Sequence, residues 1–177
     1  GHQPPGTIGG ESTADLLRQA RYDNAVKAVV LRVDSPGGSM FASEQILREV
    51  QSLRKAGKPV VVSMSTYAAS GGYYISAAAN QIFASPTTLT GSIGVFSIVP
   101  TFQHTLEKLG VKVDGIGTTP LAGGMRQDRT LSAATRQILQ ASVDHAYAEF
   151  LRRVADGRKK TVDDVDKIAQ GRVWAGA

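Results

Sequence analysis

Ser70 is the residue whose surroundings point most directly to chemistry. It stands in YAASGGYYIS, residues 67–76, between an apolar run typical of a strand and a run typical of a helix. Two alanines precede it and two glycines follow it, so little side-chain bulk surrounds its hydroxyl. A serine at the start of a helix also lies beside free backbone N–H groups and the positive end of the helix dipole. This setting suits a nucleophile whose reaction creates an oxyanion.

A second glycine-rich turn, DSPGGS at residues 34–39, would supply another oxyanion donor. The two turns follow successive strand-like runs that a single helical run joins. In such a strand–helix–strand unit both turns lie at the same edge of the sheet. We expect the N–H of Gly71 and that of Gly37 or Gly38 to face Ser70. The alternative, in which Ser70 is a plain helix N-cap and the glycines only form turns, stays open on these residues alone.

The base that a serine nucleophile needs is not evident. His2 lies in a Gly/Pro-rich segment, and His104 and His145 lie in helical patterns away from the turns, so a Ser/His/Asp triad is unpersuasive. A lysine with a lowered pKa is the other solution. None of the lysines falls in a glycine-rich loop; they are Lys27, Lys55, Lys58, Lys108, Lys112, Lys159, Lys160 and Lys167.

Composition excludes several other classes of function. The net charge of +5 is spread over amphipathic segments without interleaved aromatics, which argues against a nucleic-acid partner. No phosphate loop, dinucleotide fingerprint or metal-ligand spacing is present, so we expect no cofactor and no metal. There is no cysteine, which excludes a thiolate nucleophile, and no apolar run approaches the roughly 20 residues of a membrane span.

The elements that must position Ser70 alternate between strands and helices. We expect a flexible lead-in at residues 1–10 and one domain over 11–177. Because the strand-like runs are continuously apolar, the pattern predicts an α/β domain with a mainly parallel sheet, flanked by helices and buried on both faces. The expected helices are 12–23, capped by Ser12 or Thr13, 40–58, a short one after Ser70, 99–110, 131–158 and 161–170. The expected strands are 25–34, 60–65, 81–86, part of 87–97, and 111–117.

Three blocks of the chain, residues 29–46, 57–96 and 167–177, closely resemble the signal peptide peptidase A family, the S49 serine proteases. Their order and spacing are retained from about residue 8 to the end. The resemblance implies a ClpP/crotonase-type fold. It also implies a Ser/Lys dyad that cleaves apolar peptides, including remnant signal peptides left in the membrane, and assembly as a homo-oligomer.

The resemblance assigns roles residue by residue. The family's nucleophile falls on Ser70, its oxyanion donors on Gly38 and Gly71, and a serine that orients the lysine on Ser92. The expected substrate-binding residues are Gly37, Ser39, Ala68, Ala69 and Gly91.

One departure from the family concerns the lysine. In single-domain members it lies further along the same chain, at a place that falls around Ala122, and no lysine stands between Lys112 and Lys159. In two-domain members the C-terminal half carries the serine and the N-terminal half supplies the lysine. We therefore expect this chain to be the serine-bearing half, truncated at its C-terminal end. The lysine-bearing half would be its partner, and the parent would be membrane-associated on the periplasmic side of a bacterial inner membrane.

Two other classes of function stay open at this point. The chain could be a non-catalytic interaction or assembly domain in which Ser70 is only a cap. It could also be a crotonase-type acyl-CoA enzyme, which shares the fold and its oxyanion turns. That chemistry usually places acidic residues near the turns, and the segment around Ser70 has none.

Overall fold

The computed structural model describes residues 2–4, 6–119 and 121–176. The chain divides into two compact units, the first made of Gly1–Gly94 and Tyr147–Ala177 and the second of Val95–Ala146. The first unit holds all the strands of the described residues, β1 (Val29–Ser35), β2 (Val60–Ala69), β3 (Gln81–Phe83), β4 (Leu89–Gly91) and β5 (Val173–Ala175), with helices α1 (Gly10–Tyr22), α2 (Met40–Lys55), α3 (Gly71–Ser76) and α6 (Val162–Ile168). The second unit holds α4 (Gln103–Lys108), and α5 (Ala133–Arg158) begins in it and ends in the first.

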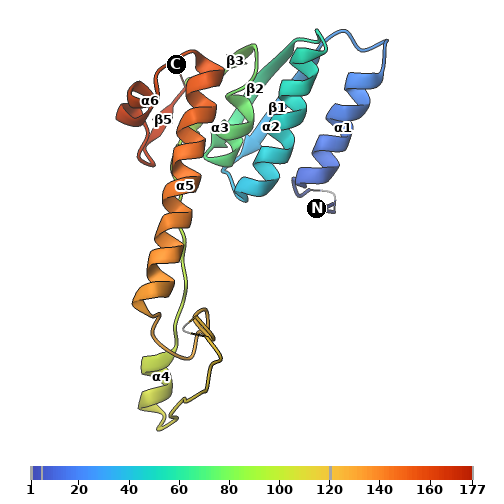
Figure 1. Ribbon diagram of the computed structural model, residues 1–177. Helices are drawn as coiled ribbons and strands as arrows, with labels where there is room; N and C mark the ends of the chain where they lie inside the picture. The colour runs from blue at the N-terminus through green and yellow to red at the C-terminus, as the bar shows by residue number, and fades with distance from the viewer. Residues whose placement is uncertain (1, 5, 120, 177) are drawn as a thin grey trace. The chain divides into compact units, whose positions relative to one another are not determined.

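The sheet of the first unit is mainly parallel, as the sequence predicts. β2 is its central strand and pairs with β1 on one side; on the other side it pairs first with β3 and then with β4, and all these pairings are parallel. β5 adds to β4 in the antiparallel direction. Figure 1 shows α2 and α3 packed beside β1 and β2. The fold is therefore α/β, and the parallel strands bring their carboxyl ends to one edge.

The helices of this chain bury one face of the sheet. Val60, Val62 and Met64 of β2 point into the core with side chains from α2, α3 and α5. On the other face Val30 is 71% exposed, and Arg32 lies across β2 with its guanidinium bonded to the hydroxyls of nearby serines. The expectation of a sheet buried on both faces is thus wrong for this chain. Val33, Val60 and Val62 face the core, whereas Arg32 and Ser63 share the uncovered face with Val30, so the strands alternate between the two faces.

A bulge turns the end of β2 toward β4. Val33 pairs with Met64, but Ser35 pairs with Ala68, so β2 has two more residues than β1 over this stretch. The Asp34 carboxylate accepts a hydrogen bond from the Tyr67 N–H at 3.1 Å, which satisfies a donor that the interrupted ladder leaves free. The last three residues of β2 then pair with β4.

Three local expectations differ from the structure. α1 begins after Gly9 instead of being capped by Ser12 or Thr13, and the Ser12 hydroxyl donates to the Gly9 carbonyl. Residues 111–117 form no strand, because their stretch finds no neighbouring strand to pair with in the second unit as described. β5 was not expected.

Among the described residues, no helix combines the length and apolar content that crossing a membrane requires.

β2 passes into α3 through one strained residue, Ser70. Its φ of 50° and ψ of −118° belong to a region that side-chain-bearing residues rarely adopt. The Ser70 N–H donates to the Gly91 carbonyl, and the Ser70 carbonyl accepts from the Tyr74 N–H, both at 2.8 Å. The side chain makes no capping bond. An N-cap serine has an extended backbone and accepts from the first turn, so the plain-cap alternative is wrong.

Because the strain at Ser70 is a property of the backbone, glycine should relieve it. We expect Ser70→Gly to be more stable to unfolding than Ser70→Ala by about 1 kcal/mol, since alanine retains the Cβ that this conformation disfavours. Urea denaturation of the two variants measures the difference. Equal stability, or a more stable alanine variant, would show that the positive φ is not strained in solution.

α5 packs closely against the end of α3. A Cβ placed on Gly157 would lie 2.1 Å from the carbonyl oxygen of Ala77. Gly157→Ala should therefore destabilise the fold by about 3 kcal/mol, the upper end of overpacking costs. Asp156→Ala, at the exposed neighbouring position, should change the unfolding free energy by no more than about 0.5 kcal/mol. Similar midpoints for the two variants in chemical denaturation would contradict this packing.

Candidate active site

Three turns meet at the carboxyl edge of the sheet. Gly37 and Gly38 follow β1, Ser70 follows β2 and Ser92 follows β4. The parallel pairings Ser35 with Ala68 and Ala69 with Gly91 bring the turns side by side. The prediction that both glycine-rich turns lie at one edge is confirmed.

The turn at Gly37–Gly38 and the turn at Ser70–Gly71 are in contact because glycine has no side chain. A Cβ on Gly37 would lie 2.7 Å from the Cβ of Ser70 and 3.0 Å from its Oγ. A Cβ on Gly71 would lie 2.7 Å from the Ser43 Oγ and 3.3 Å from the Gly38 N. Any larger residue at 37 or 71 would push the turns apart, which is why the sequence has glycine there.

The two turns hold free backbone donors beside the Ser70 hydroxyl. The Gly37 N–H donates to the Ser35 Oγ at 3.2 Å. In contrast, the Gly38 and Gly71 N–H groups donate to no protein acceptor within the described ranges. Of the two glycines that the sequence leaves open, Gly38 is thus the one with an available donor. Two uncommitted N–H groups beside a hydroxyl can bind an oxygen that gains negative charge.

Ser92 is fixed beside Ser70 by the C-terminal block of the chain. It directly follows Gly91, whose carbonyl accepts from the Ser70 N–H. Its own N–H donates to the Arg172 carbonyl at 2.7 Å, and its φ is 49°. Sequence reasoning included this block in the resemblance but did not predict β5, which holds the Ser92 turn in place.

The other predicted substrate-binding residues lie in different settings. Ser39 is the N-cap of α2, and its hydroxyl accepts from the Ala42 N–H. Ala68 is fully buried in the core, and Ala69 is nearly so. Gly91, with a φ of 75°, is covered by the Trp174 ring.

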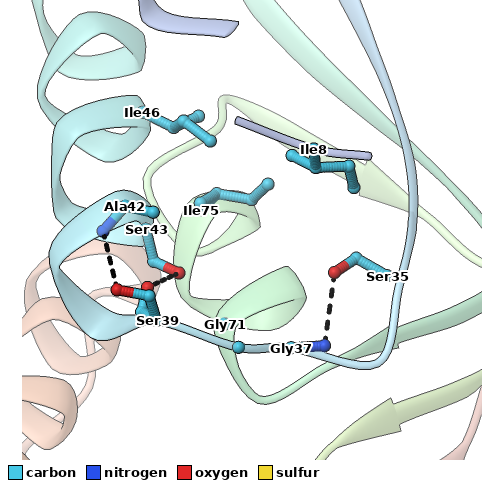
Figure 2. A pocket seen from close by; sticks show the side chains of 10 residues that line it. Ile8, Ser35, Gly37, Ser39, Ala42, Ser43, Ile46, Gly71 and Ile75 are labelled. Carbon is cyan, nitrogen blue, oxygen red and sulfur yellow. Dashed lines mark hydrogen bonds between the residues drawn. The ribbon is translucent and has the colours of Figure 1, made fainter. Parts of the chain in front are cut away.

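A small apolar cavity of about 60 Å³ lies next to the Gly37–Gly38 turn. Figure 2 shows the side chains of Ile8, Ile46 and Ile75 on one side of it, and Ser39 and Ser43 at the start of α2 on the other. Ile8 comes from the predicted lead-in, and sequence reasoning missed all three isoleucines. The helical period of α2 would have assigned Ile46 to the core, but nothing local indicates that it faces this cavity.

Among the described residues of the first unit, no lysine is arranged to act on Ser70. Lys27 precedes β1, and Lys55 and Lys58 precede β2. They lie at the opposite end of strands that run about 23 Å and about 33 Å, respectively, at roughly 3.3 Å per residue. Lys159 and Lys160 directly follow the end of α5. There the Arg158 guanidinium donates to the carbonyl of Ala79, which lies beside the start of β2, so these two lysines also lie toward the end of the sheet away from Ser70.

Lys167 also lacks the properties of a base. Its Nζ lies 3.0 Å from the Asp164 carboxylate, and the hydrogen bond with Asp164 raises its pKa. A catalytic base needs the opposite shift, toward neutrality. Lys108 and Lys112 belong to the second unit.

Comparisons with known proteins agree with this architecture. The chain is 52% identical to Protease 4 from Salmonella typhi and 50% identical to Protease 4 from Haemophilus influenzae; the alignments cover 99% and 96% of this chain but 28% and 27% of those proteins. It thus spans little more than a quarter of their length. A solved structure of a ClpP1 mutant from Listeria monocytogenes superimposes with a TM-score of 0.55 over 93% of this chain and 72% of that one, at 13% identity. This likeness shows the ClpP/crotonase-type fold.

The family itself follows from a match over most of the sequence. The sequence model described as "Peptidase family S49" covers residues 52–177, which include Ser70, Gly71, Ser92 and the C-terminal block. The chain belongs to peptidase family S49.

Proposed function

We propose that this chain is the nucleophile-bearing part of a serine endopeptidase. The observation that carries the proposal is the strained Ser70, whose side chain caps no helix and lies against the Gly37–Gly38 turn. In the reaction the Ser70 Oγ attacks the scissile carbonyl carbon while a base takes the hydroxyl proton. The Gly38 and Gly71 N–H groups bind the oxyanion of the tetrahedral intermediate. The protonated base then gives its proton to the leaving amine, and water hydrolyses the acyl-enzyme.

The base is a lysine from another domain of the parent protein or from a neighbouring subunit. The positions of the lysines of the first unit, which precede the strands, follow α5, or pair with a carboxylate, support this part of the proposal. A lysine brought to Ser70 would be enclosed among backbone groups, and loss of water would lower its pKa toward neutrality. Ser92, beside Ser70, is the candidate that orients its amine.

The substrates we propose are apolar peptides such as remnant signal peptides. The cavity beside the oxyanion turn is lined by three isoleucines and could take an aliphatic side chain next to the scissile bond. We further propose that the parent protein is membrane-associated, with this domain on the periplasmic side of a bacterial inner membrane.

The nucleophile is tested in the full-length parent protein with an apolar peptide ester. We expect Ser70→Ala to lower kcat/KM at least about 1,000-fold, as removal of a serine nucleophile does in other peptidases. Ser52→Ala, which deletes a hydroxyl on α2 bonded to the Arg48 carbonyl, is the matched control and should retain activity. If Ser70→Ala hydrolyses the ester like the parent, the chain is an interaction domain and not the nucleophile-bearing part.

The external lysine is tested with the chain alone. We expect no hydrolysis by residues 1–177 or by their Ser70→Ala form, and a Ser70-dependent return of activity when the N-terminal part of the parent is added. The readout is the initial rate of ester cleavage. Activity of the chain alone that Ser70→Ala abolishes would place the base inside this chain or its homo-oligomer, against the proposal.

A further inference from the structure

Glu44 joins three helices of the first unit through one carboxylate. Its Oε2 accepts a hydrogen bond from the Tyr74 hydroxyl of α3 at 2.7 Å. Its Oε1 accepts from the Arg153 Nη2 of α5 and from the Arg48 Nε of its own helix, both at 2.8 Å. The Glu44 side chain is only 18% exposed. Three donors meet the hydrogen-bonding capacity of this half-buried carboxylate. The Glu44 side chain therefore connects α2 to α3 and α5 through charge-assisted hydrogen bonds.

The bond between Glu44 and Tyr74 joins the two helices that begin just after the oxyanion donors. α2 begins after the turn that carries Gly38, and Glu44 lies in its second turn. α3 begins at Gly71, and Tyr74 lies one turn on, with its N–H bonded to the Ser70 carbonyl. The bond between Glu44 and Tyr74 therefore ties together the starts of the two helices, and so limits how far the Gly38 and Gly71 N–H groups can separate.

The Tyr74 end of the connection is rigid. Tyr74 is 2% exposed, and its ring packs against Phe150 of α5 with centroids 4.9 Å apart. Arg153 lies one turn further along α5, so the same helix holds both the ring and the carboxylate. Removal of the bond would leave a buried phenol hydroxyl unpaired, which the fold would relieve by moving α3.

The charges favour this bond at neutral pH. Burial favours the neutral acid of Glu44, but the bonds from Arg48 and Tyr74 and the charge of Arg153 outweigh it, and the net effect lowers its pKa. Burial, with the bond to Glu44, raises the pKa of Tyr74 to about 12. Glu44 is therefore an anion and Tyr74 a protonated donor throughout the range of ordinary assays.

We propose that Glu44 is a positioning residue for the oxyanion hole, acting through Tyr74 and held by Arg153. The inference rests on the proposed peptidase function of this site. Glu44 touches no substrate in this scheme. It fixes the spacing of Gly38 and Gly71, and that spacing matters because oxyanion donors act only within a narrow range of distances from the developing charge.

The test uses the full-length parent protein with Glu44→Gln and Tyr74→Phe. We expect kcat to fall about 10- to 100-fold in each, less than the loss of a whole oxyanion donor, while KM for the peptide ester changes less than about threefold. Affinity for a peptide aldehyde, which forms a tetrahedral adduct with the serine, should fall by the same factor as kcat. A role in stability alone would lower the unfolding midpoint without this parallel loss.

Glu49→Gln is the matched control. Glu49 lies on the same helix, its side chain is 13% exposed, and its carboxylate binds Arg18 and Arg21 of α1 in place of α3. The variant loses the same charge and should keep kcat within about twofold. If Tyr74→Phe does not unfold cooperatively, Glu44→Asp, which keeps the charge and shortens its reach, replaces it with the same expectation.

Two outcomes overturn the proposal. Folded Glu44 and Tyr74 variants with parental kcat and aldehyde affinity would show that the bond does not position the donors. A Glu49→Gln variant as impaired as Glu44→Gln would show a general effect of charge on α2. Failure of the underlying function looks different, because Ser70→Ala would then retain activity in the same assay.

Discussion

The contact between two glycine turns is the constraint on which the rest of this structure depends. Ser70 can lie against Gly37, and Gly71 against Ser43 and Gly38, only because no Cβ separates them. This contact brings the turn that carries the Ser70 hydroxyl against the turn that carries the Gly38 N–H group. The strand pairings, the helix contacts and the C-terminal strand all maintain this approach.

Several unrelated parts of the chain converge on that contact. The bulge in β2, stabilised by Asp34, redirects the strand toward β4 so that Gly91 can hold the Ser70 N–H. β5 holds the Ser92 turn from the far end of the sequence. Glu44 and Tyr74 hold the two helices from behind. The candidate site is thus built largely from main chain, and most of the side chains that hold it lie outside the contact between the two turns.

The sequence predicted those features that depend on neighbours along the chain. The apolar strand runs, the helical periods and the glycine turns each carry a local pattern, and together they gave the parallel sheet and the common edge of Ser70 and Gly38. Features that depend on distant partners were missed. β5 has only three residues, and Glu44 and Tyr74 are 30 positions apart. Residues 111–117 show the converse, since a strand-like pattern forms no strand without a neighbour.

The plain-cap alternative for Ser70 shows the same limit in one residue. Serine, a helix start and following glycines fit a cap and a nucleophile equally well in sequence. The backbone angles and the hydroxyl's lack of a capping partner argue against the cap. Those angles are held by a tertiary contact, the bond from the Ser70 N–H to the Gly91 carbonyl, together with the local bond from the Tyr74 N–H to the Ser70 carbonyl.

The residues that hold Ser70 in its strained conformation bear on how the proposed site would be assembled. The main-chain bonds that impose this conformation all lie within the first unit. The contacts that hold the unfavourable geometry are therefore complete within this unit. In the proposed scheme a later association needs to deliver only an amine to a preformed surface. Activation would then be a binding equilibrium between two folded domains. A newly made chain would not cleave other proteins until that binding occurs.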